Sequence, residues 1–247
     1  MSAIYIMWRR QLIRYWRSRG RMIGALGQPL LFLFALGFGL GPLYAQAGAG
    51  NYLQFLAPGV IAMTILFSAM FSGIEVIWDR QFGFLKETLV APVSRLEIMI
   101  GKTVGGATVA MLQGFLVFIV TLIAGFRPHL SGLLIAIVFM FLIALLFTAA
   151  GVALASKLED MQAFPLIMNF LIMPIFFLSG ALFPLKDLPW FLDFITKINP
   201  LTYGVDGIRG ALTGVYHFNP FLDFFIITAL MVIVTAIGTY LFSKVEA

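Results

Sequence analysis

The sequence of 247 residues contains no cysteine and few ionisable side chains. The absence of cysteine excludes disulfides, thiolate metal sites and cysteine nucleophiles. The two histidines, His129 and His217, show no metal-ligand spacing. Charged residues make up 11% of the chain and hydrophobic residues 61%, which leaves too little polar surface to cover a soluble globule of 27.3 kDa. We therefore predict an integral membrane protein.

One stretch without charge is too long for a single membrane crossing. From Met22 to Ile74 no residue is Asp, Glu, Lys or Arg. As one helix this stretch would be about 80 Å long at ~1.5 Å per residue, against a hydrocarbon core of about 30 Å. It must therefore fold back once, and the residues from Gly41-Pro42 to Asn51 mark the break.

Further apolar stretches complete an all-α transmembrane domain that occupies residues 1–247. Each stretch is near or above the roughly 20 residues that a spanning helix needs. Pro165, Pro174 and Pro184 recur along the fifth of them, where each removes a backbone donor and permits a kink. The sequence predicts six spans at about 22–43, 54–78, 99–125, 131–155, 163–185 and 221–243.

The distribution of lysine and arginine predicts the orientation. Six spans place both termini on one side, and twelve of the 16 lysines and arginines fall on that side. We therefore expect both termini in the cytoplasm and the protein in the cell membrane. The isoelectric point near 9.6 does not indicate a nucleic-acid partner, because the arginines flank a span, where anionic membrane lipids account for them.

Residues 3–19 predict an amphipathic helix along the inner membrane surface. At 100° per residue, Trp8 clusters with other aromatic and aliphatic side chains, while Arg10, Arg14 and Arg17 lie opposite. Aromatic rings suit the headgroup boundary and guanidinium groups suit phosphate or a cytoplasmic partner. Two interpretations remain open: a membrane anchor that sets topology, or a collar that contacts another protein.

The loop between the second and third spans predicts a second short helix, at about 80–92. Phe82, Leu85 and Leu89 are spaced i, i+3 and i+7, and Pro92 ends the pattern. A short rod with one apolar face could insert into a groove on a cytoplasmic motor protein. An ordinary surface helix between two spans has the same pattern.

Residues 186–220, on the opposite side, predict two apolar pieces too short to cross the membrane. Asn199-Pro200 separates them. Their apolar faces need cover, so we expect re-entrant helices that dip into the outer leaflet or pack on the mouth of the bundle. A plain capping loop is the alternative. Asp206 and Arg209, at i and i+3, could pair.

Two ionisable residues near the inner ends of the spans need partners. We expect Glu75 to form an ion pair with Arg80, Arg95 or Lys102, in preference to acting in a proton relay. Gly101-Lys102-Thr103 mimics the end of a phosphate-binding loop, but Leu96 stands where that motif needs glycine. We expect Lys102 to extend to lipid headgroups instead.

Two motifs resemble a known family. The stretch Gly83-Phe84-Leu85-Lys86-Glu87-Thr88-Leu89-Val90-Ala91-Pro92-Val93-Ser94, followed by Gly101-Lys102, resembles the cytoplasmic signature of type 2 ATP-binding cassette (ABC) exporter permeases of the drug-resistance and nodulation-factor kind. Phe177-Leu178-Ser179-Gly180, Phe183-Pro184, Asn199-Pro200-Leu201-Thr202-Tyr203 and Arg209 resemble its second hallmark. The resemblance runs along nearly the whole chain.

The resemblance implies a six-helix permease subunit that pairs with a second copy or a close relative. Two copies of a separate ABC ATPase subunit would bind ATP and Mg, while this chain binds no cofactor and no metal and has no catalytic residues. The N-terminal helix would help to dock the ATPase. The implied coupling residues are Arg80, Gly83, Leu85, Lys86, Glu87, Leu89 and Pro92, and the implied outer gate consists of Gly180, Pro184, Asn199, Pro200, Tyr203 and Arg209.

Several transport functions fit these expectations. The spans supply mainly Phe, Leu, Ile and Met, with few polar groups such as Gln113, Thr148 and Asn169, which favours an apolar or amphiphilic substrate. By family analogy its path would be a dimer cleft lined by the second and fifth spans. Export of a lipid-linked glycan or polysaccharide is the alternative. An ion-coupled carrier or channel, or a membrane-embedded enzyme, has weaker support in the sequence.

Overall fold

The structure is a computed structural model that describes residues 3–46, 50–82, 93–158 and 160–243. The described residues form helices joined by turns and short loops. Residues 83–92, which carry most of the predicted coupling helix, lie outside the described residues.

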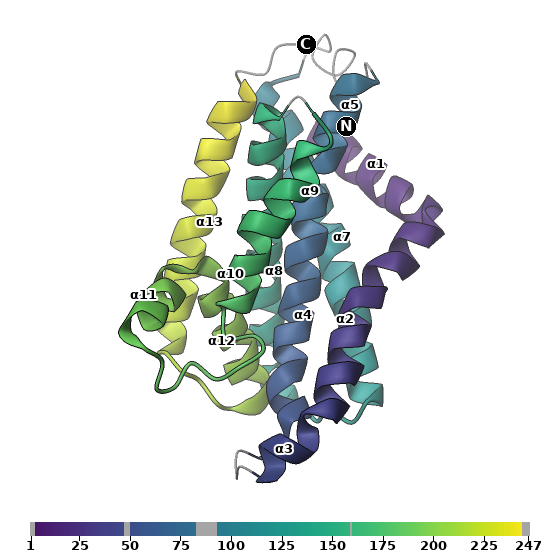
Figure 1. The fold of residues 1–247 in the computed structure, drawn as a ribbon. Coiled ribbons are helices and arrows are strands. Elements are labelled where there is room, and N and C mark those ends of the chain that lie inside the picture. Colours follow the sequence, from purple (N-terminus) through teal and green to yellow (C-terminus); the bar gives the residue numbers. More distant parts are fainter. Residues whose placement is uncertain (1–2, 47–49, 83–92, 159, 244–247) are drawn as a thin grey trace.

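Five helical segments of the described chain are long and apolar enough to cross a membrane, at Met22–Gly39, Tyr52–Gln81, Arg95–Ile123, Leu130–Lys157 and Pro220–Ser243. They contain α2 (Arg19–Gly39), α4 (Tyr52–Phe71) with α5 (Ile74–Gln81), α7 (Arg95–Ile123), α8 (Leu133–Lys157) preceded by η1 (Leu130–Gly132), and α13 (Pro220–Ser243). The central helix is α4, which packs against α2, α7 and α8 (Figure 1). These segments agree with an all-helical, multi-pass membrane fold, and each overlaps one of the predicted spans.

The fifth predicted span, 163–185, is shorter than expected. It consists of α9 (Ala163–Ile167), the π-helical turn η2 (Met168–Ile172) and α10 (Met173–Phe177). The π turn comes just before Pro174, which has no backbone N–H to donate the hydrogen bond of a regular α-helix. After Phe177 the chain turns, and Gly180 has a left-handed φ of 73°. The helical part, Ala163–Phe177, is too short to count with the five spans.

The N-terminal helix and the turn between the first two spans follow the sequence pattern closely. The first helix, α1, covers Ala3–Arg17, and the chain bends at Ser18 before α2. The predicted break contains the short helix α3 (Gly41–Gln46). Asn51 then caps α4 by accepting a hydrogen bond from the backbone N–H of Leu53 at 2.9 Å.

The predicted re-entrant pieces are α11 (Trp190–Ile198) and α12 (Pro200–Thr213). The apolar face of α12 is covered by the helix bundle and not by the outer leaflet. It is buried from Leu201 to Leu212 and contacts α4, α8 and α13. The other piece, α11, lies at the edge of the bundle (Figure 1), and much of its apolar face is exposed. Asn199 separates them, as predicted, and caps α12 by accepting from the N–H of Leu201 at 3.0 Å.

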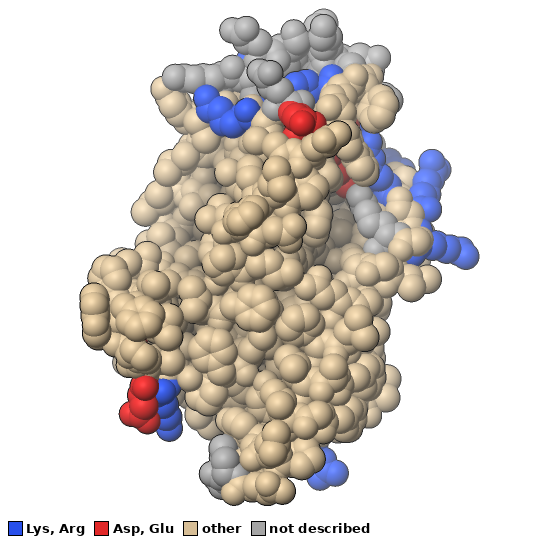
Figure 2. Space-filling view, viewed as in Figure 1, with Lys and Arg blue, Asp and Glu red and all other residues tan. Residues whose placement is uncertain are grey.

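The start of α1 and the end of α13 lie at the same end of the bundle as α5, whereas α3 lies at the opposite end (Figure 1). On the face shown in Figure 2, charged side chains gather at the two ends and along α1, and an uncharged band separates them. A broad uncharged band is what the lipid hydrocarbon requires of a membrane protein surface.

Candidate functional site

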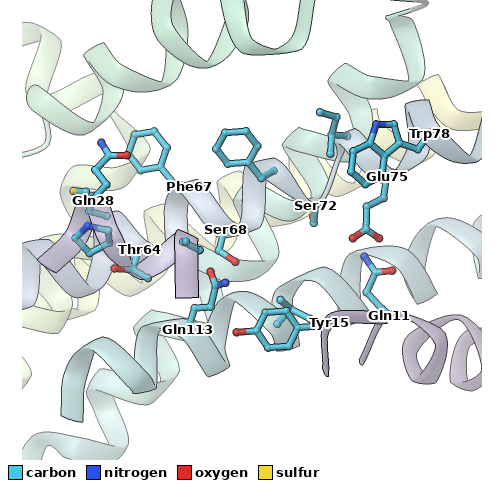
Figure 3. Close-up of a pocket in the computed structure, with 17 residues that line it drawn as sticks. Gln11, Tyr15, Gln28, Thr64, Phe67, Ser68, Ser72, Glu75, Trp78 and Gln113 are labelled. Atoms are coloured by element: carbon cyan, nitrogen blue, oxygen red, sulfur yellow. The ribbon is translucent and has the colours of Figure 1, made fainter. Parts of the chain in front are cut away.

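A cavity of about 490 Å³ lies between α1, α2, α4, α5 and α7. Most of its wall is apolar and aromatic, with Met63, Phe67 and Phe71 from α4 and Trp78 from α5. Polar groups converge on this apolar wall from α1, α2, α4, α5 and α7 (Figure 3). A concave apolar site with a few placed polar groups is the usual form of a small-molecule site.

Several polar groups of the cavity offer hydrogen-bond acceptors. Thr64 and Ser72 donate their hydroxyl protons to the carbonyls of Val60 and Ala69 at 2.8 and 2.6 Å, so their remaining capacity is to accept. Gln113 is only 3% exposed, and its Oε1 has no hydrogen-bond partner among the described residues. Figure 3 shows Gln113 between the ends of the cavity, with Glu75 and Gln11 at one end and Gln28 and Thr64 at the other.

An ion-pair cluster closes the end of the cavity where Glu75 lies. Glu75 and Asp79 on α5 are each 3% exposed. Arg14 lies 3.3 Å from Glu75 and 3.6 Å from Asp79, and Arg10 lies 2.9 Å from Asp79. Lys102 of α7 also pairs with Asp79. These cations balance carboxylates that would otherwise be costly to bury.

Two sequence expectations change here. Glu75 forms an ion pair, as expected, but its partner is Arg14 of α1. The sequence pattern predicts lipid phosphate or another protein as the partner of Arg14. The expectation that Lys102 extends to headgroups is wrong, because its side chain is buried and turns inward to Asp79. Periodicity along one helix predicts its faces, but it cannot identify a partner on a distant helix.

Close packing on α7 holds α1 over the cavity. A Cβ atom on Gly101 would lie 2.7 Å from the Cβ of Met7, and one on Gly105 would lie 2.8 Å from the Cβ of Gln11. These glycines therefore allow the two helices to approach closely. Trp8, predicted to lie at the membrane interface, donates its indole N–H to Thr108 at 3.1 Å.

Arg17 and Arg80 are two described residues of the expected ATPase-facing region. Arg17 is exposed at the end of α1. Arg80 donates to the carbonyls of Ser156 and Leu158 at 2.8 and 3.1 Å and so ties the end of α5 to the end of α8. The other implied coupling residues lie outside the described residues: Gly83, Leu85, Lys86, Glu87, Leu89 and Pro92.

Of the implied outer-gate residues, Asn199 bonds to α10 and Arg209 to the turn after it, at Gly180, while Pro200 and Tyr203 lie at the start of α12. Arg209 donates to the carbonyls of Gly180 and Phe55 at 2.8 and 3.3 Å, and its guanidinium lies 3.9 Å from the ring centre of Phe55. Asn199 donates to the carbonyl of Ile175 at 2.6 Å. Pro200 begins α12, and Tyr203 donates to the carbonyl of Lys197. Pro184 instead lies on an exposed turn.

Sequence reasoning missed three contacts of this outer cluster. Tyr52 donates to the carbonyl of Leu182 at 2.8 Å. Phe55 supplies both a carbonyl and a ring to Arg209. Asp206 accepts from the backbone N–H groups of His217 and Phe218, both at 2.8 Å, so the hydrogen bonds of Asp206 and Arg209 go to groups other than each other. No local motif signals these contacts, because they join distant segments.

The cavity is a different site from the expected dimer cleft. Its wall comes from the first, second and third spans and from α1. The second and fifth predicted spans do meet, since the rings of Phe67 and Phe176 lie 6.1 Å apart edge to face. The available sequence signal for the cavity is the occurrence of Gln28 and Gln113 within otherwise apolar spans.

Comparisons with known proteins agree with the sequence motifs. The ABC-2 type transporter family model matches residues 2–213. Nodulation protein J of Rhizobium leguminosarum bv. trifolii is 32% identical over 211 residues, which cover 84% of this chain and 80% of that protein. The putative transport permease ycf38 of Cyanophora paradoxa is 30% identical over 213 residues, covering 85% and 73%. The ycf38 protein of Pyropia yezoensis is 34% identical over 215 residues, covering 81% and 70%.

The family model covers most of the chain, including the cavity, the ion-pair cluster and the outer cluster. The apolar helices independently support a multi-pass membrane protein. The chain therefore belongs to the ABC-2 type transporter family and is a membrane permease.

Proposed function

We propose that this permease is the transmembrane subunit of an ATP-driven exporter of hydrophobic or amphiphilic compounds. The substrate enters from the inner leaflet or the cytoplasm and leaves on the outer side. A separate ABC ATPase, present in two copies, binds ATP and Mg and drives the cycle. The permease works as a pair, with a second copy of itself or a close relative. Alternating closure of the pair then shifts the population between inward-open and outward-open states.

The observation that carries this proposal is the position of the cavity. Its mostly apolar wall suits an amphiphile, and Glu75 and Trp78 in that wall lie on α5. This helix ends at Gln81, immediately before the segment that resembles the family's coupling motif. A ligand in the cavity therefore contacts the element that leads directly to the proposed ATPase contact at about 80–92.

Orientation follows from the same proposal. Both termini and the segment at 80–92 face the cytoplasm, and the protein lies in the cell membrane. Arg17 on α1 and the coupling residues, among them Lys86 and Glu87, contact the ATPase. The outer cluster around Arg209 then acts as a gate on the opposite side.

The proposal is tested by reconstituting the permease with its ATPase in lipid vesicles. We expect ATP-dependent movement of a fluorescent amphiphile, and ATP hydrolysis that increases when the permease is present. Glu87→Ala or Pro92→Ala should abolish that increase while the helical content and thermal stability of the permease stay unchanged. Unchanged coupling in both variants would remove the role assigned to residues 80–92.

A second candidate is the export of a lipid-linked glycan. The observation that favours it is that Gln11, Gln28 and Gln113 line the cavity, since amide side chains can hydrogen-bond sugar hydroxyls. Parallel transport assays with a plain amphiphile and with a lipid-linked oligosaccharide separate the two. Movement of the oligosaccharide alone would favour the glycan function.

A further inference from the structure

We infer that the cavity beneath α1 is a binding site for amphiphiles that carry a positive charge, with Glu75 as the counter-ion. The inference deepens the proposed function, because it names the charge class of the substrate and the residue that recognises it.

The first argument is the charge of the wall. Among the described residues that line the cavity, Glu75 is the one carboxylic acid, and none is lysine or arginine. The hydroxyls of Thr64 and Ser72 offer acceptors to this cavity, as does the Oε1 of Gln113, which has no partner among the described residues. Together with the carboxylate of Glu75, these acceptors favour a cationic group over an anion.

The second argument is the aromatic surface close to Glu75. Phe71 and Trp78 line the cavity on either side of Glu75 in the sequence, and Phe67 lies one turn before Phe71 on α4. Aromatic faces attract cations through their quadrupole, most strongly where water is excluded. A carboxylate together with aromatic faces recognises ammonium and delocalised cations, while the same rings provide contact area for an apolar body.

The third argument is that Glu75 can accept a ligand without leaving Arg14 unpaired. Arg14 reaches Glu75 at 3.3 Å, which is long for a charge-assisted hydrogen bond, and it also lies 3.6 Å from Asp79. A ligand cation that takes over Glu75 therefore leaves Arg14 with a second carboxylate. This exchange avoids the large cost of an uncompensated buried charge.

The inference also links binding to α1. Arg14 belongs to α1 and Glu75 to α5, so occupancy of the cavity changes a contact that joins these two helices. Both helices lie next to the proposed ATPase contact. Binding of a cation would thus be communicated to the ATPase by a shift of Arg14 from Glu75 toward Asp79.

The test uses the purified full-length permease in detergent, without the ATPase, and two ions of matched shape. Equilibrium dialysis measures the binding of tetraphenylphosphonium, a cation, and tetraphenylborate, its anionic counterpart. We expect the cation to bind at least about tenfold more tightly than the anion, because only the cation is attracted by the charge of Glu75 and by the aromatic faces. Equal or tighter binding of the anion would overturn the inference.

Three variants locate the binding. Glu75→Gln should weaken binding of the cation by roughly tenfold or more, because it removes the charge that attracts the ion. The matched control is Asp193→Asn, which removes the same charge from an exposed side chain of α11 and should leave binding unchanged. Ser68→Trp fills the cavity from α4 without removing a charge and should abolish binding. Retained binding in either cavity variant would place the ion elsewhere.

The outcomes separate this inference from the proposed function. Binding that depends on Glu75, without ATP-driven transport in the reconstituted pair, would support the site and contradict the transport function. Transport of neutral amphiphiles, with no binding of the cation, would support the function and contradict the site.

Discussion

Lys102 lies away from solvent, where a charge is stable only with a partner. Its side chain pairs with Asp79, which is also buried. Lys102→Met should lower the free energy of unfolding by about 3 kcal/mol, because it leaves the carboxylate with fewer compensating charges. Thermal unfolding in detergent measures the change.

Lys197→Met is the control for this prediction. Lys197 forms an exposed pair with Asp193 at 2.6 Å, and such pairs contribute about 0.5 kcal/mol or less. If both variants lost the same stability, the two arginines of α1 would be sufficient partners for Asp79.

Arg209 connects α12 to the turn that follows α10. Burial lowers the pKa of Arg209 to about 10, so the guanidinium is still charged at neutral pH. Arg209→Lys keeps the charge but loses the planar guanidinium group, which donates to the carbonyls of Gly180 and Phe55 at the same time. We expect a loss of about 2 kcal/mol and faster amide hydrogen exchange over residues 178–182.

The matched control for Arg209 is Arg127→Lys, at an exposed position beyond α7. It should change neither stability nor exchange over residues 178–182. Unchanged exchange in the Arg209→Lys variant would mean that other contacts hold this turn.

At the scale of the element, the close packing of α1 against α7 is the feature most easily disturbed. Gly105→Leu would force its side chain against Gln11 and push α1 outward. Since α1 contains four arginines, its displacement should increase cleavage by trypsin within residues 9–17. Gly20→Leu is the control, because nothing lies within 4 Å of its Cβ position. Equal cleavage in the two variants would contradict close packing of α1 against α7.

The elements themselves could largely be predicted from the sequence. The predicted spans 131–155 and 221–243 differ by only a few residues from Leu133–Lys157 and Pro220–Ser243. A run of apolar residues of membrane length has few other ways to satisfy its backbone, which explains this agreement. The fifth span was overestimated, because hydrophobicity continues through residues 178–185 although the chain turns there.

The candidate site could not be predicted in the same way. The pair of Arg14 and Glu75 joins residues 61 positions apart, and Arg209 reaches Phe55 over 154 positions. Such contacts depend on how helices pack, and one sequence gives only the face that each helix presents. The outer cluster was named through motif resemblance, whereas the cavity needed the structure.

At the scale of the whole molecule, the proposed coupling to the ATPase depends on the predicted orientation of the bundle in the membrane. Because the chain has no cysteine, single introduced cysteines give labelling without background. Asp160→Cys should react with a membrane-impermeant maleimide only from the cytoplasm, and Lys186→Cys only from outside. Both positions are exposed. The opposite result would mean that the protein has the reverse orientation, with residues 80–92 on the side of the membrane away from the ATPase.

The short helical stack from α9 to α10 has a consequence for the surrounding bilayer. Ala163–Phe177 is about 22 Å long at ~1.5 Å per residue, and Leu166 and Phe170 on it are 58% and 81% exposed. Where lipid, and not a second subunit, meets this stack, we expect the bilayer to become thinner than its usual ~30 Å to match it. We expect the permease to be more thermostable in bilayers of short acyl chains than in bilayers of long ones, as unfolding in a chain-length series would measure. Cells could then tune this transporter through the thickness of their membranes.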